Sequence, residues 1–459
     1  MILIELFIFL STILPLFHLV NALCTKKRRA AVHDKEKKPM SILVPCFNEE
    51  DTIALSLRGL LAMEYAAYEV IYINDGSCDG TMDALSAALD LVPEDALSDI
   101  SDLRAHKVFR SRTRSLGIRG IYRSRRHKNF FVIDKQNGGK SSALNAGICF
   151  AHHDLIVTLD ADSVLERTAL SRMSGAMSDK DVVAVGGSIH IMQGYDQGYL
   201  KGRFEKKRGV LVTMQILEYL KGFYIYKLSL AKQNATAIIS GAFGVFTKDI
   251  LLRAGGFRKT LGEDIDITLN IQQMIHKTHK KLLYLPDALC YTQCPESWRD
   301  LTRQRIRWQK GFVNCAGYYR RFLLKTMFTK SLSFHFFIEA LLVGICSCTF
   351  TVFTYAFVAV LAFGNAQTAV VFGIYYGFGL VFTVLYALSA IFISIKHNRY
   401  PKAILKKAVP AILLDILFYR FFNLAMYIGG TVSYFWKRGG RHDWNKVARS
   451  KRAFNVGNI

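Results

Sequence analysis

Long apolar runs lie near both ends of the chain, and a more polar stretch separates them. The first run covers residues 2–23 and carries a single acid, Glu5, while the later runs cover residues 337–363, 369–395 and 408–435. At a rise of about 1.5 Å per residue, each run is long enough to cross a hydrocarbon core of roughly 30 Å as a helix. The pattern therefore predicts an N-terminal anchor over residues 1–25 and transmembrane segments over residues 331–436.

The charges around these runs predict their orientation. The first run is followed at once by the basic letters CTKKRR, whereas a cleaved signal peptide carries its positive charge before the apolar run. We therefore expect an uncleaved, multi-pass protein of the cell membrane with the middle of the chain in the cytoplasm. Three later spans would put the basic tail, residues 437–459, outside, against the positive-inside trend. Either the charge rule fails or the last run is re-entrant or interfacial, so the prediction is three or four spans. Asp415 and Arg420 within this run favour a helix that faces protein or lies near the interface.

The polar middle of the chain, residues 39–295, alternates between short β-rich runs and helical runs. The expected strands cover residues 40–49, 68–75, 129–136 and 154–162, and the expected helices cover residues 50–63, 80–89 and 141–151. Strands separated by helices predict an α/β fold with a doubly wound, mostly parallel sheet. In such a sheet, ligands bind at the carboxyl ends of the strands.

Composition narrows the classes of partner. The chain has 459 residues, of which 51% are hydrophobic, and 60 lysines and arginines against 36 acids give a net charge of +24. Such a charge suits anionic lipid headgroups, phosphorylated substrates or nucleic acid. A basic insertion over residues 103–129 is interpreted as a solvated loop or a lipid-facing patch; RNA binding has no folded motif behind it, and no nucleic acid is expected. The nine cysteines include no C-x-x-C pair, which is typical of reduced, buried thiols.

The letters DKQNGGKSSALNAG, residues 134–147, contain a glycine pair followed by Lys140. A phosphate-binding P-loop needs glycine at the first position of G-x-x-x-x-G-K-[ST], and this chain has Asp134 there. A carboxylate at that position would face the phosphate, and its Cβ would obstruct the turn. The stretch is therefore not an ATPase signature, although two glycines beside a lysine still indicate an anionic ligand.

Carboxylates follow two of the expected strands. Asp75 ends one strand, and Asp160 and Asp162 follow the apolar letters LIVTL. Positions i and i+2 of an extended chain point to the same side, so Asp160 and Asp162 would share Mg²⁺ or Mn²⁺ with substrate phosphates. Asp75 would accept hydrogen bonds from a base or a ribose. The alternatives are an ordinary Asp-Gly-Ser turn at Asp75 and an acidic turn or helix cap at Asp160 and Asp162.

The letters GEDIDIT place Glu263 and Asp264 at the expected start of a helix. The helix dipole alone favours acids at that end, which is one interpretation. The other is that a buried Asp264, beside Glu263 and a metal-bound diphosphate, acts as a general base.

The letters RQRIRWQKG place Gln304, Arg307, Trp308 and Gly311 on one face of a helix. Arginine supplies donors to a diphosphate, and tryptophan offers a flat surface to a sugar ring. A membrane-surface helix with snorkelling arginines and an interfacial tryptophan would show the same pattern, and the two interpretations are compatible.

In this order, a strand-end Asp, D-x-D, E-D and Q-x-x-R-W before C-terminal apolar runs resemble the processive family 2 glycosyltransferases. These are the membrane synthases of cellulose, chitin, hyaluronan and poly-β-1,6-N-acetylglucosamine. The likeness covers about residues 40–311, and GEDIDIT, QRIRW and NGGKSSALNAG are most similar to the bacterial poly-β-1,6-N-acetylglucosamine synthase branch. It implies a GT-A-type domain over residues 39–295, inserted between transmembrane helices, with amphipathic interface helices over residues 296–330.

The resemblance also implies a role for each motif residue. The implied donor-binding residues are Phe47, Glu49, Asp75, Lys140, Asp160, Asp162, Gln304 and Arg307, with Asp160 and Asp162 as the ligands of Mg²⁺ or Mn²⁺. The implied acceptor-binding residues are Ser240, Gly241, Ala242 and Trp308. The implied catalytic residues are Glu263 and Asp264, with Asp264 as the base.

The implied activity is polymerisation of a β-linked polysaccharide from a UDP-sugar, with UDP-N-acetylglucosamine favoured, by a single inverting displacement. The implied partners are the UDP-sugar donor, a growing glycan or lipid acceptor, membrane lipids and an accessory membrane subunit. Two alternatives remain open. One is a non-processive transferase that places one sugar on a polyprenyl phosphate or a glycolipid, and the other is a catalytically silent sugar-nucleotide sensor or scaffold.

This chain departs from the family pattern in three places. Asn74 stands where relatives more often have Asp, Cys46 stands where many have another small residue, and one N-terminal apolar run stands where this branch often has two. These departures leave every expected catalytic carboxylate in place. The resemblance also implies that the membrane segments form a channel through which the polymer is secreted, and these departures bear on that channel more than on the chemistry.

Overall fold

The structure is a computed structural model that describes residues 2–25, 37–94, 109, 113, 116–195, 206–339, 363–364, 366–397 and 402–436. The chain divides into two compact units, and each is described by itself. The sheet unit contains the described residues within 37–195 and 236–294, and the helix unit contains those within 2–25, 206–235 and 295–436. Residues 206–235 thus belong to the helix unit, although the sequence placed them within the domain of residues 39–295.

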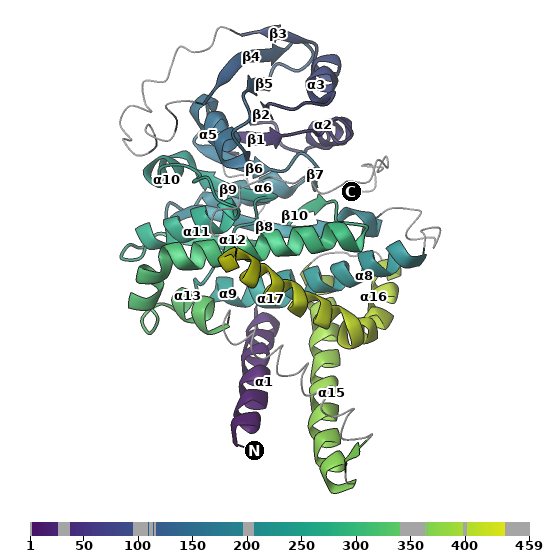
Figure 1. The fold of residues 1–459 in the computed structure, drawn as a ribbon. Coiled ribbons are helices and arrows are strands. Elements are labelled where there is room, and N and C mark those ends of the chain that lie inside the picture. Colours follow the sequence, from purple (N-terminus) through teal and green to yellow (C-terminus); the bar gives the residue numbers. More distant parts are fainter. Residues whose placement is uncertain are drawn as a thin grey trace. The chain divides into compact units, whose positions relative to one another are not determined.

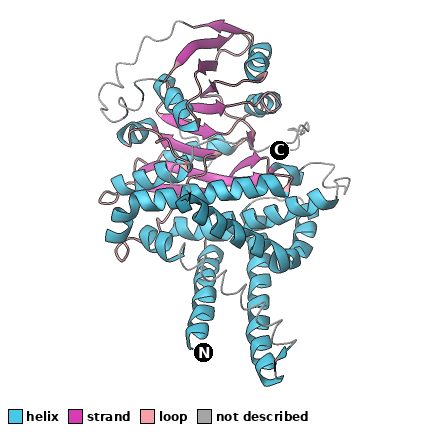
Figure 2. Cartoon of the chain, in the orientation of Figure 1, coloured by secondary structure: helices cyan, strands magenta, loops and turns pink. Residues whose placement is uncertain are grey.

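A ten-stranded sheet forms the centre of the sheet unit, with the strand order β3-β4-β5-β2-β1-β6-β9-β8-β10-β7. Figure 2 shows the strands in magenta and the helices in cyan. The strands are β1 (Met40–Cys46), β2 (Tyr68–Asp75), β3 (Leu91–Pro93), β4 (Ile118–Ser124), β5 (Phe130–Lys135), β6 (Leu155–Leu159), β7 (Ser163–Leu165), β8 (Val182–Ile191), β9 (Phe243–Thr247) and β10 (Lys281–Thr292). The four strands expected from the sequence are β1, β2, β5 and β6, and all four are confirmed.

The sheet is mixed, so the expectation of a mostly parallel sheet is corrected. The strands β5, β2, β1 and β6 form the parallel centre that the alternation of strands and helices predicted, and β8 and β10 form a further parallel pair. On one side β4 returns antiparallel along β5, and on the other β9 lies antiparallel between β6 and β8. The short connection between β4 and β5 favours antiparallel neighbours, whereas β9 enters the sheet after the long segment that contains the helices of residues 206–232.

Strand β4 lies inside the basic insertion of residues 103–129, where the sequence analysis expected a loop or a lipid-facing patch. Ile121 and Ser124 are buried, and Arg119 and Arg123 are exposed, so burial along this short strand does not follow a strict period of two. The pairing with β5 shifts register between Ile118 and Gly120, as at a β-bulge. The part of the insertion before residue 116 lies outside the described residues, apart from Phe109 and Thr113.

Helices cover both faces of the sheet (Figure 1). They are α2 (Ile53–Leu61), α3 (Thr81–Leu89), α5 (Lys140–Phe150), α6 (Ala169–Met177), the 3₁₀ turn η2 (Met192–Tyr195), α10 (Lys248–Arg253) and α11 (Glu263–Met274), and α2, α3 and α5 confirm the expected helices. Ala143 of α5 and Ile271 of α11 share a buried cluster with Leu43, while Leu55 of α2 shares another with Val164. Because both faces are covered, the strand ends are the places open to ligands.

The helix unit consists, in its described part, of helices and three π-helical turns. These are α1 (Ile2–Leu23), α8 (Lys206–Lys221), η3 (Gly222–Tyr226), α9 (Lys227–Lys232), α12 (Trp298–Lys325), α13 (Ser331–Phe334), η4 (His335–Glu339), α15 (Ala366–His397), α16 (Lys402–Leu414), η5 (Asp415–Tyr419) and α17 (Arg420–Trp436). Helix α1 matches the first apolar run, and α15 contains the run of residues 369–395.

Two described helical segments, Gly377–His397 and Lys406–Trp436, are long and apolar enough to cross a membrane, with mean hydropathies of 2.3 and 1.6. A shorter apolar segment, Ile13–Leu23, lies in α1. Most of the run expected over residues 337–363 and the whole basic tail of residues 437–459 lie outside the described residues.

The last apolar run packs against other helices of the helix unit. Helix α17 lies along α12, where the Nε2 of Gln309 donates to the Oγ1 of Thr431 at 3.0 Å. A Cβ on Gly430 would lie 2.6 Å from the Cβ of Gln309, so glycine permits this close approach. Figure 1 shows α12 and α17 running across the direction of α1 and α15.

Both charges in the last apolar run have partners in the protein. The Nζ of Lys221 donates to the Oδ2 of Asp415 at 2.6 Å, and a guanidinium nitrogen of Arg420 donates to the Oγ1 of Thr383 at 3.3 Å. The two charges thus face protein, which the sequence analysis had named as one of two placements for this segment.

Candidate active site

The carboxyl ends of four parallel strands meet at one edge of the sheet unit. In the strand register Cys46 of β1 lies opposite Asn74 of β2, and Asp75 lies opposite Lys135 of β5. On the other side of β1, the strand β6 ends just before Asp160. The expected strand-end residues therefore come from neighbouring strands, and half-buried Phe47 follows β1 directly.

The carboxylate of Asp75 is bound by its own chain. The Nζ of Lys135 donates to Oδ1 at 2.6 Å, the backbone N–H of Gly138 donates to Oδ1 at 3.0 Å, and that of Gly139 donates to Oδ2 at 2.7 Å. The side chains of both Asp75 and Lys135 are buried. Asp75 therefore shapes the glycine loop that leads into α5, whose first residue is Lys140.

Sequence reasoning missed Lys135. A lysine at a strand end is usually assigned to solvent, because lysine is rarely fully buried unless it is paired. The available signal was its place at the end of an apolar strand, two residues after buried Ile133, where a side chain points to the same face.

Two strand-end loops are hydrogen-bonded to each other beside Asp75. The Oδ1 of Asn48 accepts from the backbone N–H of Cys78 at 2.8 Å, and the backbone N–H of Glu49 donates to the Oγ1 of Thr81 at 2.7 Å. The carboxylate of Glu49 accepts from the Oγ1 of Thr52 at 2.8 Å, just before α2 begins. Glu49 therefore supports the loop that carries Phe47.

Lys140 lies at the centre of the acidic side chains. Its Nζ is 2.6 Å from the Oδ1 of Asp160 and 3.0 Å from the Oε1 of Glu263, and it donates to the carbonyl oxygen of Gly241 at 3.4 Å. The Lys140 side chain is 9% exposed and that of Glu263 is 11% exposed, whereas that of Asp160 is 32% exposed. The fold thus brings together, around one ammonium group, residues that the sequence assigned to donor, acceptor and catalytic roles.

The electrostatics of this cluster follow from enclosure and charge. Burial lowers the pKa of the Lys140 ammonium, but the carboxylates of Asp160, Glu263 and Asp264 outweigh burial and raise its pKa above the ordinary value. Burial raises the pKa of the Asp160 carboxyl, Lys140 opposes this, and the negative charge of Asp162 raises the pKa further. The site is therefore rich in negative charge and has the Lys140 ammonium between two of its carboxylates.

Asp162 is buried and turns toward β10. Its Oδ1 accepts from the Oγ of Ser163 at 3.2 Å and from the Oγ1 of Thr292 at 3.4 Å. Within the described part of the chain, no three His, Cys, Asp or Glu side chains are grouped closely enough to hold a metal ion by themselves. One or two carboxylates completed by substrate phosphates is the arrangement typical of Mg²⁺.

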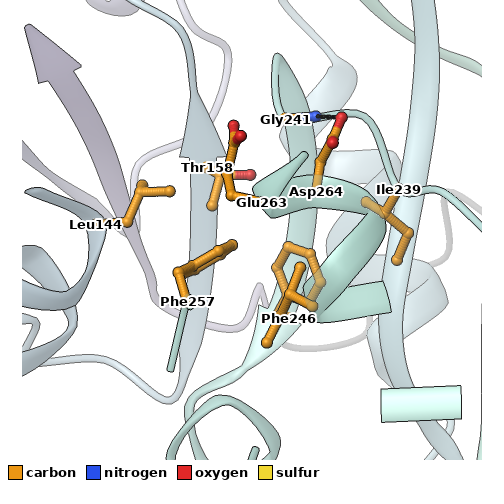
Figure 3. A pocket seen from close by; sticks show the side chains of 9 residues that line it. Leu144, Thr158, Ile239, Gly241, Phe246, Phe257, Glu263 and Asp264 are labelled. Carbon is orange, nitrogen blue, oxygen red and sulfur yellow. Dashed lines mark hydrogen bonds between the residues drawn. The ribbon is translucent and has the colours of Figure 1, made fainter. Parts of the chain in front are cut away.

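Asp264 stands at the start of α11, facing the loop of residues 240–242 (Figure 3). Its Oδ2 accepts from the backbone N–H of Gly241 at 3.3 Å, and its Oδ1 accepts from that of Ile265 at 2.8 Å. The Oγ1 of Thr268 donates to the carbonyl of Asp264 at 2.6 Å and accepts from the N–H of Ile239 at 3.0 Å. The loop expected to contact the acceptor is thereby fixed to the helix that carries the expected base.

A small cavity adjoins these acids. Figure 3 shows the carboxylates of Glu263 and Asp264 on one side of it and the rings of Phe246 and Phe257 on the other. The remaining lining residues are Leu144, Thr158, Ile239, Gly241 and Ile267. The carboxylates of Glu263 and Asp264 therefore border a largely apolar cavity, which limits the access of water to them from that side.

The motif Gln304, Arg307 and Trp308 lies on α12 in the helix unit, whereas Asp160, Glu263 and Asp264 belong to the sheet unit. Gln304 is buried, and Trp308 is 40% exposed. The guanidinium of Arg305 lies over the Trp308 ring, 4.5 Å from its centroid.

Arg305 and Glu218 are neighbours of this motif that sequence reasoning missed. A guanidinium nitrogen of Arg305 donates to the Oε2 of Glu218 at 2.7 Å, and the Oη of Tyr419 donates to the same oxygen at 2.8 Å. No local pattern relates these residues, because they come from α12, α8 and η5, which are distant in the sequence.

Two models of glycosyltransferase families match this chain. A model of "Glycosyl transferase family 2" matches residues 41–118, and one of "Glycosyl transferase family group 2" matches residues 155–365. The chain is 27% identical to a poly-β-1,6-N-acetyl-D-glucosamine synthase of Staphylococcus aureus (strain MSSA476) over 62% of this chain and 57% of that protein. It is 28% identical to the synthase of the same name from Staphylococcus epidermidis over 59% of this chain and 54% of that protein.

Among solved structures, the mannosyltransferase PcManGT from Pyrobaculum calidifontis, in complex with GDP-Man and Mn²⁺, is similar with a TM-score of 0.55. The match covers 86% of this chain and 97% of that chain at 18% sequence identity. At that identity the likeness concerns the fold. The alignment with the curated synthases spans little more than half of their length.

Proposed function

We propose that this chain, a glycosyltransferase that carries family 2 domains, polymerises a β-linked polysaccharide from a UDP-sugar and works in a membrane. The observation that carries the chemistry is the convergence of Asp160 and Glu263 on Lys140, with Asp264 beside them. This set supplies a base, acids for a cation and a place for an anionic leaving group at the carboxyl edge of the sheet.

Asp264 acts as the general base. It removes the proton from the acceptor hydroxyl while that oxygen attacks the anomeric carbon of the donor, and UDP leaves on the opposite side. Because the reaction is a single displacement, an α-linked donor gives a β-linked product. The bond from the N–H of Gly241 orients the Asp264 carboxylate, and the apolar cavity beside it keeps water away from the reacting oxygen.

The residues present fit a divalent cation, because carboxylates are its preferred ligands and the cluster already has a cation, the Lys140 ammonium, between Asp160 and Glu263. Asp160 and Asp162 would hold Mg²⁺ or Mn²⁺ together with the diphosphate, and the solved fold neighbour binds Mn²⁺ with its sugar nucleotide. Bound there, the ion would supply charge stabilisation for the departing UDP. Phe47 and Asp75 would line the uracil pocket, and Glu49 would support the loop that carries Phe47.

The polymer and its sugar rest on the likeness to poly-β-1,6-N-acetyl-D-glucosamine synthases, so UDP-N-acetylglucosamine is the proposed donor. The membrane location rests on α1, α15 and the last apolar run. In this proposal Gln304 and Arg307 contact the diphosphate of the donor. Trp308 and residues 240–242 contact the acceptor. The proposed partners are a growing glycan or lipid acceptor, membrane lipids and an accessory membrane subunit.

The test is a turnover assay of the full chain in lipid with Mg²⁺ or Mn²⁺ and a panel of labelled UDP-sugars. Products are sized on a gel. A ladder of long products from UDP-N-acetylglucosamine is expected. A lipid-soluble product with one added sugar would overturn polymerisation and favour the non-processive alternative, whereas absence of turnover with every donor would favour the silent sensor or scaffold.

A further inference from the structure

The ammonium group of Lys140 makes all of its close polar contacts with oxygens of the protein. Its three donor positions face the Oδ1 of Asp160, the Oε1 of Glu263 and the carbonyl oxygen of Gly241, at 2.6, 3.0 and 3.4 Å. The side chain is 9% exposed, so protein rather than water surrounds this charge. Lys140 is therefore a cation built into the acidic cluster.

The backbone at residue 241 is shaped for this cation. A Cβ on Gly241 would lie 2.9 Å from the Nζ of Lys140 and 3.2 Å from the Oε1 of Glu263. Any side chain at this position would push the lysine away from the two oxygens. The glycine thus permits an enclosed seat for the ammonium group beside the loop that faces Asp264.

The three partners of Lys140 differ in how firmly they are fixed. Glu263 and Gly241 belong to the loop and helix that hydrogen bonds through Asp264 and Thr268 tie together. Asp160 is the most exposed of the carboxylates that Lys140 contacts, at 32%, and water or another cation can reach it. Lys140 can therefore release Asp160 while it keeps its bond to Glu263.

A divalent cation on Asp160 and the present position of Lys140 compete for the same carboxylate. Like charges a few ångströms apart repel strongly in a protein environment, so both cannot be held close to Asp160 at full strength. A nucleoside diphosphate changes this balance, because its oxygens bring negative charge that both the ion and the lysine can contact.

We propose that Lys140 is a tethered counter-cation that holds Asp160 until a nucleoside diphosphate arrives. It makes binding of the divalent cation conditional on the nucleotide. Lys140 then moves from Asp160 to the phosphate oxygens and stays next to Glu263. This inference rests on the proposed function for the identity of the ligand, but its effect is measured on the metal alone. Lys140 acts as a positioning residue for the ion as well as a contact for the donor.

The test measures Mn²⁺ binding to the full chain in lipid by electron paramagnetic resonance, first without nucleotide and then with UDP. Lys140→Gln removes the competing charge, and Lys140→Met does so with a different shape. Both variants are expected to bind free Mn²⁺ about tenfold or more tightly than the unchanged chain, since one unit charge at this range is worth at least that factor. The same variants are expected to bind UDP more weakly.

Two controls make the result specific. Lys248→Gln removes the same charge at the opposite end of β6, where the Lys248 Nζ donates to the carbonyl of Ala151, and should leave Mn²⁺ binding unchanged. Lys140→Arg keeps the charge and should leave free Mn²⁺ binding as weak as in the unchanged chain. Circular dichroism of each variant checks that the fold is retained.

The outcomes separate this inference from the proposed function. Equal or weaker binding of free Mn²⁺ by Lys140→Gln and Lys140→Met would overturn the tethered counter-cation and leave Lys140 as a donor contact alone. Asp160→Asn tests the metal site by itself. If Asp160→Asn binds Mn²⁺ with UDP as well as the unchanged chain does, the metal placement in the proposed function is wrong, whatever the lysine variants show.

Discussion

Two acidic positions at the same edge of the sheet are neutralised in different ways. Asp75 has a carboxylate that is bound by Lys135 and by the N–H groups of Gly138 and Gly139, and its side chain is 4% exposed. Asp160 is bound by Lys140 alone among the salt bridges of the described residues, and its side chain is 32% exposed. Both pairs have a separation of 2.6 Å, so distance does not distinguish them.

What distinguishes the two pairs is whether water or a ligand can replace the lysine. A carboxylate that is enclosed and bound by backbone donors is part of the framework, because losing its partner leaves an uncompensated buried charge. A carboxylate that solvent reaches can exchange one cation for another at small cost. The edge of the sheet thus combines a fixed half, around Asp75, and an exchangeable half, around Asp160.

The largest expected effect lies next to the exchangeable half. Asp264→Asn should lower turnover by about 10²–10⁴-fold, the usual contribution of a general base, while UDP binding is unchanged. Turnover and equilibrium binding of labelled UDP are measured on the same preparation. Asp249→Asn, an exposed acid of α10, is the matched control and should retain full turnover. Near-normal turnover in Asp264→Asn would show that another group is the base.

The comparison itself is tested by removing each lysine. Lys135→Met should weaken the local stability of β2 and β5 by about 3–5 kcal/mol, because Asp75 is left charged and buried. Lys140→Met should weaken the local stability of β6, the strand that leads into Asp160, by less, because water reaches Asp160 even though Glu263 also loses this partner. Hydrogen exchange of the amides in these strands measures the free energy of local opening in the full chain. Equal losses in the two variants would break the distinction between a fixed and an exchangeable half.

The smallest expected effect concerns the glycine loop that Asp75 holds. Gly139 has a φ of +85° and a ψ of 165°, a region that is essentially restricted to glycine, but a Cβ there would meet nothing within 4 Å, so Gly139→Ala should cost about 1–3 kcal/mol from the backbone conformation alone. Gly76 has a φ of +68°, and its Cβ would lie 2.6 Å from the backbone nitrogen of Asn137. Gly76→Ala should therefore cost more. Hydrogen exchange at Gly138 gives the ranking, and the reverse order would contradict this account of the loop.

The sequence predicted the parallel centre of the sheet because each of its strands is an apolar run next to a helical run. It did not predict β4, because its letters IRGIYRS contain two arginines and its buried residues, Ile121 and Ser124, do not follow a period of two. It did not predict β9 between β6 and β8 either, since strand order depends on pairing between distant segments. Local periodicity identifies elements, whereas long-range pairing decides which of them become neighbours.

The site shows the same division. Asp75, Asp160, Glu263 and Asp264 were identified from their positions at element ends, and the structure finds the last three around or beside Lys140. The lysine bridge between residues 140, 160 and 263 is a tertiary contact that no spacing reveals. Lys135 and Arg305 were missed for a related reason: each is a long cationic side chain whose burial depends on an acid from another element.

The position of Lys140 on α5 has a consequence for folding. It is the first residue of that helix, where the partial positive charge of the peptide dipoles makes a cation unfavourable by about 0.3–1 kcal/mol. The helix would be more stable with an acid or a neutral residue there, so local helix preference and the demands of the acidic cluster conflict. This first turn is a locally frustrated segment, and a variant chosen only to strengthen α5 would remove the charge around which the cluster is arranged.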